Sequence, residues 1–139
     1  MTALIVLVDT PLDVFLDSNG DLDFSVGGGP TLVAGVAGVA QLCRMSMLMF
    51  RGEWFLERTI GIPYYANDYV AATVALLEQK YDAGKVSSAY TLELLKVPGV
   101  AKVTSMSISF NNTTRVLSVA FEVLTTFGDT TNADVAIGA

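Results

Sequence analysis

The stretch 103-VTSMSISFNNTTRVLSVAFEVLTTF-127 contains two apolar alternations separated by four polar residues. In its first half the residues at 104, 106, 108 and 110 alternate with serines, and in its second half large apolar residues recur at every second position from 117 to 123. A period of two is typical of a strand that buries one face. The polar residues 111–114 favour a turn between the two strands. The stretch therefore predicts an antiparallel β-hairpin.

The residues that follow this hairpin, 128-GDTTNADVAIGA-139, are mostly small or polar. They offer little apolar surface to hold them against a core, so we expect residues 128–139 to be a flexible C-terminal tail. The rest, residues 1–127, is expected to be one domain. The tail could become ordered by pairing with a strand of a neighbouring subunit.

The N-terminal part of the chain is expected to hold strands. Residues 3–8, ALIVLV, form a short continuous apolar run that is typical of a buried strand. Within residues 12–29 two short apolar-containing runs flank a turn at 18–21, which predicts an N-terminal β-hairpin. Acidic and amide residues around this turn are spaced as in a calcium loop, but Leu22 stands where that loop requires glycine. A solvated turn is the better interpretation.

Three helices are expected between the two hairpins. The first spans residues 30–50 and is apolar around nearly its whole circumference, which is typical of a buried helix. The second spans residues 68–84, after a cap at Asn67. The third is shorter, starts near residue 87 and ends before Pro98. The predicted fold class is α+β: an N-terminal β-hairpin, three helices and a C-terminal antiparallel β-hairpin in one small domain.

Composition narrows the classes of function. The chain has 139 residues, of which 52% are hydrophobic and only 16% charged. The charged fraction lies below the typical value of about a quarter, so we expect other subunits to cover part of the surface; the alternative is a compact monomer with a large core. The net charge is −6, and residues 1–30 carry five aspartates without a lysine or arginine. Binding to nucleic-acid phosphates is therefore not expected.

The sequence lacks the residues that several kinds of catalytic and metal-binding site require. Without histidine the chain has no Ser–His or Cys–His nucleophile pair and no histidine-based metal site. The single cysteine, Cys43, cannot form an internal disulfide and is expected to pack as a small hydrophobe. The N-terminus lacks the basic start of a signal peptide, which fits a cytoplasmic, reducing setting. A membrane-active protein that uses residues 27–43 is an alternative, although this run is shorter than the about 20 residues of a membrane span.

The stretch 51-RGEWFLERTIGIPYY-65 raises the possibility of an enzyme. It places Glu53 and Glu57 beside Trp54, the only tryptophan. Glycoside-cleaving enzymes use two carboxyl groups about 5–9.5 Å apart, and two glutamates one helical turn apart face the same way. A peptidoglycan-cleaving hydrolase that uses Glu53 and Glu57 is therefore one hypothesis.

The alternative for the same stretch is a structural corner. Glu53 could pair with an arginine, for which Arg44, Arg51 and Arg58 are candidates, and a carboxylate held by arginine fixes a corner through directed hydrogen bonds. The turn at Gly61 requires unusual backbone angles. The apolar residues of the stretch would anchor it to the core: Trp54, Phe55, Leu56 and Ile60. One chain segment seldom builds both walls of a cleft, which favours the corner.

The order of short motifs along the chain resembles that of a known family. The motifs are Gly20-Asp21 in a hairpin, Gln41 in an apolar helix, Gly52-Glu53-Trp54, Gly61-Ile62-Pro63-Tyr64, Val97-Pro98-Gly99-Val100 and a polar turn with Arg115. In this order they are similar to the small baseplate wedge subunits of contractile phage tails. That family, long labelled lysozyme-like, is related to the small subunit of the type VI secretion baseplate. The resemblance covers about residues 17–127.

The resemblance implies a structural protein without enzymatic activity or cofactor. Family members lie around the tail tube in the baseplate of the virion, which is assembled in the host cytoplasm. They join a helix bundle with a larger baseplate wedge protein and contact the first ring of tail sheath protein. Tail tube or hub proteins are further candidate partners, and neither nucleic acid nor a membrane is expected.

The resemblance also assigns residues to two roles. Glu53 matches a glutamate of the family by its position after Gly52, but the proline and arginine that follow in the family are replaced here by Trp54 and Phe55. The arginine partner of Glu53 therefore stays open. The expected structural core motif comprises Gly52, Glu53, Trp54, Arg58, Gly61 and Pro63. Partner contacts are expected at Gly35, Gly38, Val39, Leu42, Met49, Phe121 and Val123, with the edges of residues 103–126 and the tail open to strand addition.

Overall fold

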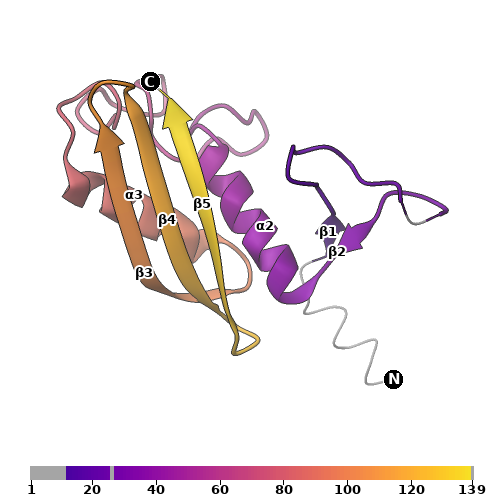
Figure 1. The fold of residues 1–139 in the computed structure, drawn as a ribbon. Coiled ribbons are helices and arrows are strands. Elements are labelled where there is room, and N and C mark those ends of the chain that lie inside the picture. The colour runs from indigo at the N-terminus through magenta and orange to yellow at the C-terminus, as the bar shows by residue number, and fades with distance from the viewer. Residues whose placement is uncertain (1–11, 26, 139) are drawn as a thin grey trace.

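The computed structural model describes residues 12–25 and 27–138, so the strand expected at residues 3–8 lies outside the described part. The elements in chain order are β1 (Asp13–Val14), β2 (Leu32–Val33), α2 (Gly35–Leu48), α3 (Ala83–Lys96), β3 (Val100–Asn111), β4 (Val116–Thr125) and β5 (Thr130–Gly138). Strands β3, β4 and β5 form an antiparallel sheet, with α2 and α3 on one of its faces (Figure 1). A second antiparallel sheet pairs β1 with β2. The expected mixture of helices and antiparallel strands in a small domain is confirmed, but the described residues contain two helices rather than three.

The C-terminal hairpin forms as predicted. Met106 pairs with Phe121 and Phe110 pairs with Leu117, so the apolar rows of the two strands share one face. The register shifts between Val103 and Ser105. Because this irregularity changes the phase of the strand, Thr104 is exposed, although the alternation placed it with the apolar residues. Its hydroxyl instead donates to the Glu122 carboxylate at 2.8 Å.

The expectation of a flexible tail at residues 128–139 is wrong for most of its length, because Thr130–Gly138 forms β5. This strand pairs with β4 in an unbroken antiparallel register, with Val135 opposite Val119 and Ile137 opposite Leu117. Val135 and Ile137 are buried. The alternation of apolar and polar residues in the tail adds a third row to the inner face of the sheet, which outweighs its small and polar composition.

The N-terminal hairpin is smaller than expected. Its turn lies where the sequence predicts it, with the Asp17 N–H bonded to the Asp21 carbonyl at 2.9 Å, but only one bridge follows, between Leu16 and Leu22. The Asp17 carboxylate accepts the N–H groups of Asn19 and Asp21 and so closes the turn. The chain then returns through β2, which pairs with β1.

We call residues 12–33 the N-terminal arm. The start of the expected helix 30–50 belongs to the arm. The backbone of residues 31–33 pairs with that of residues 13–15, and α2 begins only at Gly35. The Gln41 side chain joins the two, since its amide nitrogen donates to the Val14 carbonyl at 2.8 Å and its oxygen accepts the Leu16 N–H at 3.0 Å. The arm lies beside α2, on the side away from α3 (Figure 1).

The helix predicted at residues 68–84 does not form. This segment consists of turns, and its backbone bonds to a distant part of the chain: the Leu76 N–H donates to the Pro63 carbonyl at 2.8 Å and the Leu77 N–H to the Tyr64 carbonyl at 3.0 Å. Tertiary hydrogen bonds thus override the helical spacing of its apolar residues. The next helix, α3, begins at Ala83 rather than near residue 87, because the Asp82 carboxylate caps its first turn.

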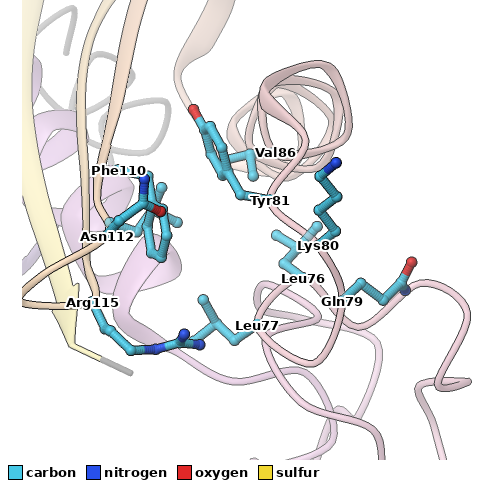
Figure 2. Close-up of a pocket in the computed structure, with 10 residues that line it drawn as sticks. Leu76, Leu77, Gln79, Lys80, Tyr81, Val86, Phe110, Asn112 and Arg115 are labelled. Atoms are coloured by element: carbon cyan, nitrogen blue, oxygen red, sulfur yellow. The ribbon is translucent and has the colours of Figure 1, made fainter.

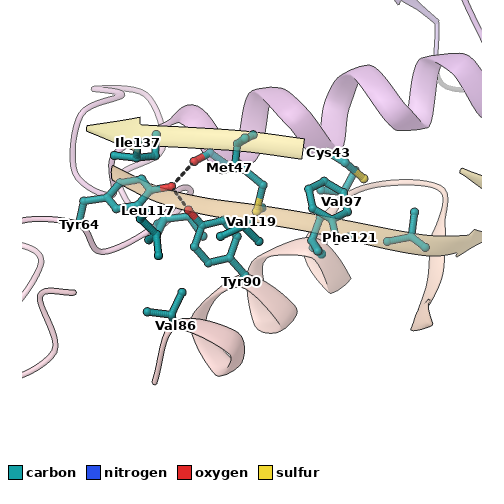
Figure 3. Close-up of a cluster of buried hydrophobic side chains, with 14 of the residues drawn as sticks. Cys43, Met47, Tyr64, Val86, Tyr90, Val97, Leu117, Val119, Phe121 and Ile137 are labelled. Carbon is teal, nitrogen blue, oxygen red and sulfur yellow. Dashed lines mark hydrogen bonds between the residues drawn. The ribbon is translucent and has the colours of Figure 1, made fainter. Parts of the chain in front are cut away.

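The core lies between the sheet and the two helices (Figure 3). Helix α2 contributes Val39, Cys43 and Met47, and α3 contributes Val86, Tyr90 and Leu94. The inner faces of β4 and β5 supply Leu117, Val119, Phe121, Val123, Val135 and Ile137. Among the described residues, no helix is both long enough and apolar enough to cross a membrane.

Candidate functional site

A buried carboxylate forms the centre of the corner at residues 49–64, and it belongs to Glu93 of α3 rather than to Glu53. Only 1% of Glu93 is exposed. Its carboxylate lies 3.6 Å from the Arg51 guanidinium and 3.2 Å from the Lys96 ammonium. A buried carboxylate of this kind is stable only when it is paired and hydrogen-bonded. Sequence reasoning missed this residue.

Gly61 is held by both members of the Arg51–Glu93 pair. Its N–H donates to Glu93 Oε1 at 2.7 Å, and its carbonyl accepts Arg51 Nε at 3.1 Å. Its backbone φ is +105°, and a Cβ at this position would lie 2.6 Å from the Met49 carbonyl oxygen. Only glycine fits this close approach. The ion pair therefore locks a backbone turn onto α3.

Two buried tyrosines extend the corner into the core. The Tyr64 hydroxyl donates to the Met47 carbonyl at 2.6 Å and pairs with the Tyr90 hydroxyl (Figure 3). Burial raises the pKa of Tyr90 to about 12 and raises the pKa of Tyr64 further. Burial likewise raises the pKa of the Cys43 thiol to about 12, so at neutral pH this thiol is neutral and unreactive. The three groups tie α2, α3 and the corner together as neutral packing elements.

Glu53 and Glu57 do not form a cleft. Both are exposed, and each caps its own loop: Glu53 Oε2 accepts the Phe50 N–H at 3.0 Å, and Glu57 Oε1 accepts the Thr59 hydroxyl at 2.6 Å. The bonds from Thr59 lower the pKa of Glu57. A general acid in a glycosidase needs a raised pKa, so the environment of Glu57 is the opposite of the one that the hydrolase hypothesis requires.

The rest of the expected core motif is split between the interior and the surface. Pro63 is buried, and Gly52 has a φ of +91° against the Asn67 side chain. Arg58 donates to the Gly52 carbonyl at 3.2 Å, and its guanidinium lies 5.0 Å from the centre of the Tyr69 ring. Within the described residues, Glu53 forms no ion pair with an arginine.

The expected apolar anchors of this loop point outwards. Trp54, Phe55 and Leu56 are 41%, 71% and 68% exposed. The loop is closed by bonds between its own ends, such as the Arg51 N–H to the Ile62 carbonyl at 3.0 Å, so it needs no apolar anchor. Three adjacent large side chains in solvent form a surface that a partner could cover.

The residues expected to contact partners mostly serve the chain's own core. Gly38 and Val39 of α2 are buried against the sheet, and Leu42 packs at the edge of the same core. Gly35 and Met49 flank the helix and are half-buried. Phe121 and Val123 are 3% and 0% exposed, so a direct partner contact through them is inconsistent with this structure. They face inwards because they lie on the core-facing row of β4.

The exposed side of α2 lines a groove with the N-terminal arm. It carries Ala37, Arg44, Met45 and Leu48, and Phe15 and Leu16 of the arm form the opposite wall of a cavity of about 350 Å³. Met45 and Leu48 are 39% and 44% exposed. The spacing i, i+7, i+8 and i+11 places these helix residues on one face.

The two edges of the large sheet differ. Strand β3 has two register irregularities, at Val100–Lys102 and Val103–Ser105, and it carries Lys102. Irregular pairing and an edge lysine both protect a strand from pairing with a further strand. Strand β5 pairs over nine residues without a shift and contains neither lysine nor proline. Among the described residues no strand pairs with its outer edge. The edge of β5 is thus open to another strand.

The comparison with known proteins agrees with this structural character. Residues 12–128 match the family of contractile injection system sheath initiators, and the chain belongs to this family. The family is structural and relates the chain to the sheath and baseplate of a contractile tail. No curated protein matches the sequence.

Proposed function

We propose that the chain is a subunit of the tail baseplate wedge that lies around the tail tube and starts the sheath by accepting a sheath strand at β5. The open edge of β5 carries this proposal. Its backbone groups supply main-chain hydrogen bonds to an added strand, as in other cases of strand addition. Membership in the sheath-initiator family supports the tail sheath protein as the donor.

The contrast between the two sheet edges supports a single docking strand. A free edge carries a risk of aggregation, and natural proteins protect such edges unless a partner covers them. The bulges and Lys102 protect β3, whereas β5 lacks these devices. One open edge gives the added strand one position and one direction. This suits a subunit that must set the orientation of the first sheath ring.

The exposed face of α2 is the proposed contact for the larger baseplate wedge protein. The apolar Met45 and Leu48 lie beside the arm, in a groove that can accept one side of a helix. This replaces the expected contact through Gly38 and Val39, which the sheet already covers. The same position would bring the chain close to tube or hub proteins in the virion.

A proline scan along β5 tests the strand addition. Successive residues of an edge strand direct their N–H groups alternately towards the neighbouring strand and towards the open edge. Proline removes the N–H, so substitutions at positions 132–136 should separate into two alternating classes. One class loses β4 pairing and folds poorly. The other class keeps the fold and loses binding to purified sheath subunits; if it binds sheath as the unmodified chain does, β5 is not the docking strand.

A further inference from the structure

A cavity at the end of the sheet opposite the N-terminal arm has a charge unlike that of the rest of the molecule. It lies between the β3–β4 turn, residues 76–81 and the first turns of α3, with a volume of about 350 Å³ (Figure 2). Lys80 and Arg115 line it together with Gln79 and Asn112, and no carboxylate does. In a chain of net charge −6, this is a cationic site with an apolar floor.

The floor of the cavity is aromatic and preformed. The Tyr81 and Phe110 rings are stacked, with centroids 5.1 Å apart and planes at 20°. Leu76, Leu77 and Val86 lie beside them in the cavity lining (Figure 2). A ligand for this cavity would combine a carboxylate with a large apolar side chain.

Arg115, on the cationic rim of the cavity, has an unusual backbone conformation. Its φ is +56°, and within the described part of the chain it is the one residue other than glycine with a positive φ. This left-handed conformation costs about 1–2 kcal/mol for an L-residue and favours glycine. Backbone strain of this kind is often found at binding sites. The described ion pairs include neither Arg115 nor Lys80, so their charges are not used to hold the fold.

The N-terminal arm has the complementary chemistry. Residues 12–33 contain four aspartates and no lysine or arginine. Within 21-DLDF-24 acidic and large apolar residues alternate, and Leu22 and Phe24 are 53% and 62% exposed. The segment thus presents in solvent the two kinds of group that the cavity would bind.

We propose that the arm of one copy of this chain binds, through residues 21–24, in the Arg115 cavity of a second copy. The arm and the β3–β4 turn, which lines the cavity, lie on opposite sides of the molecule (Figure 1), so the arm of one chain does not reach the cavity of the same chain. The contact is head-to-tail, and repetition of such a contact gives a ring when the rotation closes. The proposal is independent of the sheath role, because it uses neither β5 nor the exposed face of α2.

Arg115→Gly separates binding from folding. Glycine relieves the backbone strain and removes the charge, so this variant should keep or raise the midpoint of urea unfolding while self-association weakens about tenfold or more. Arg115→Lys retains the charge and should retain most of the association. On the arm, Asp21→Asn with Phe24→Ala should weaken association equally, whereas Leu12→Ala, an equally exposed position, is the matched control.

A mixing experiment by analytical ultracentrifugation tests the head-to-tail geometry. The arm variant and the Arg115→Gly variant should each be monomeric at concentrations where the unmodified chain associates. Their equimolar mixture should form a heterodimer, because each supplies the half that the other lacks. The proposal is overturned if the unmodified chain stays monomeric at every concentration, if neither variant changes its association, or if the mixture fails to pair. If the cavity binds only the larger baseplate protein, the unmodified chain will stay monomeric at every concentration.

Discussion

Glu93 and Gly61 are 32 residues apart in sequence, yet the Glu93 carboxylate accepts the Gly61 N–H at 2.7 Å in the interior of the protein. Arg51 completes the arrangement, because it donates a hydrogen bond to the Gly61 carbonyl and forms an ion pair with the Glu93 carboxylate at 3.6 Å. The corner that carries the exposed loop 52–59 is thereby attached to α3.

Glu93→Gln should destabilise the fold by about 1.5–3 kcal/mol, the range for losing a hydrogen bond to a charged group. The amide retains an acceptor for the Gly61 N–H but leaves the half-buried Arg51 without its counter-charge. Lys96 is mostly exposed and contributes little. Urea unfolding measures the difference. Glu53→Gln is the control and should change stability by less than about 0.5 kcal/mol; equal effects would show that Glu93 is not the pivot.

Gly61→Ala should destabilise by about 2–5 kcal/mol, from left-handed strain together with a backbone clash. The clash is with the Met49 carbonyl, 2.6 Å from the added Cβ. Gly20→Ala is the matched control, because Gly20 has a φ of +85° with no atom within 4 Å of its Cβ position. It should cost only the strain, about 1–2 kcal/mol. Thermal or urea unfolding distinguishes the two, and a cost at Gly61 no greater than at Gly20 would contradict the close contact.

The stability of the fold should fall at alkaline pH. In the folded chain the pKa of Cys43 is raised from 9.0 to about 12 and that of Tyr90 from 10.0 to about 12, with Tyr64 raised as well. Between about pH 9 and pH 12 the folded state therefore holds protons that the unfolded state has lost, so stability is complete below pH 9 and decreases as the pH rises. Unfolding free energies measured from pH 7 to pH 11 test this.

The Cys43→Ala variant isolates the thiol in that experiment. Its stability should begin to fall only near pH 10, where the tyrosines start to ionise in the unfolded chain. A flat profile for the unmodified chain up to pH 11 would mean that these groups are accessible to solvent rather than buried.

The parts of the fold that depend on local pattern could be predicted from sequence. The β3–β4 hairpin follows from a period of two over both strands, and α2 follows from a long apolar segment. The segment 68–82 could not be predicted in this way, because its backbone bonds to Pro63 and Tyr64 rather than to itself. Strand β5 differs from the prediction because its small and polar composition indicates a tail, whereas the alternation of Ala133, Val135 and Ile137 lets it add a row to the core-facing side of the sheet.

The candidate site was predictable in kind but not in its residues. The sequence predicts the Gly61 turn and a glutamate held by an arginine. The glutamate is Glu93, which lies outside the stretch 51–65. A signal was present: Val86, Tyr90, Leu94 and Val97 form an apolar helical stripe, and Glu93 lies within it. A carboxylate on a core-facing stripe needs a buried partner. Which arginine reaches it depends on long-range packing, which sequence spacing does not show.

The hydrolase hypothesis predicts that the chain cleaves peptidoglycan through Glu53 and Glu57, whereas the structural account predicts no cleavage. We expect the purified chain to release no soluble fragments from peptidoglycan, and the Glu53→Gln, Glu57→Gln double variant to fold and to assemble as the unmodified chain does. Turbidity of a peptidoglycan suspension measures the activity. Cleavage by the unmodified chain that disappears in the double variant would establish the enzyme and refute the purely structural account.

The kinetics of sheath assembly test the central claim most directly. Purified sheath subunits are mixed with tail tubes that carry a baseplate, with either the unmodified chain or the proline variant of β5 that keeps its fold, and sheath growth is followed by light scattering and electron microscopy. We predict that the unmodified chain removes the lag before growth and that the β5 variant, although incorporated into the baseplate, leaves the lag in place. Equal growth from both baseplates would contradict strand addition at β5.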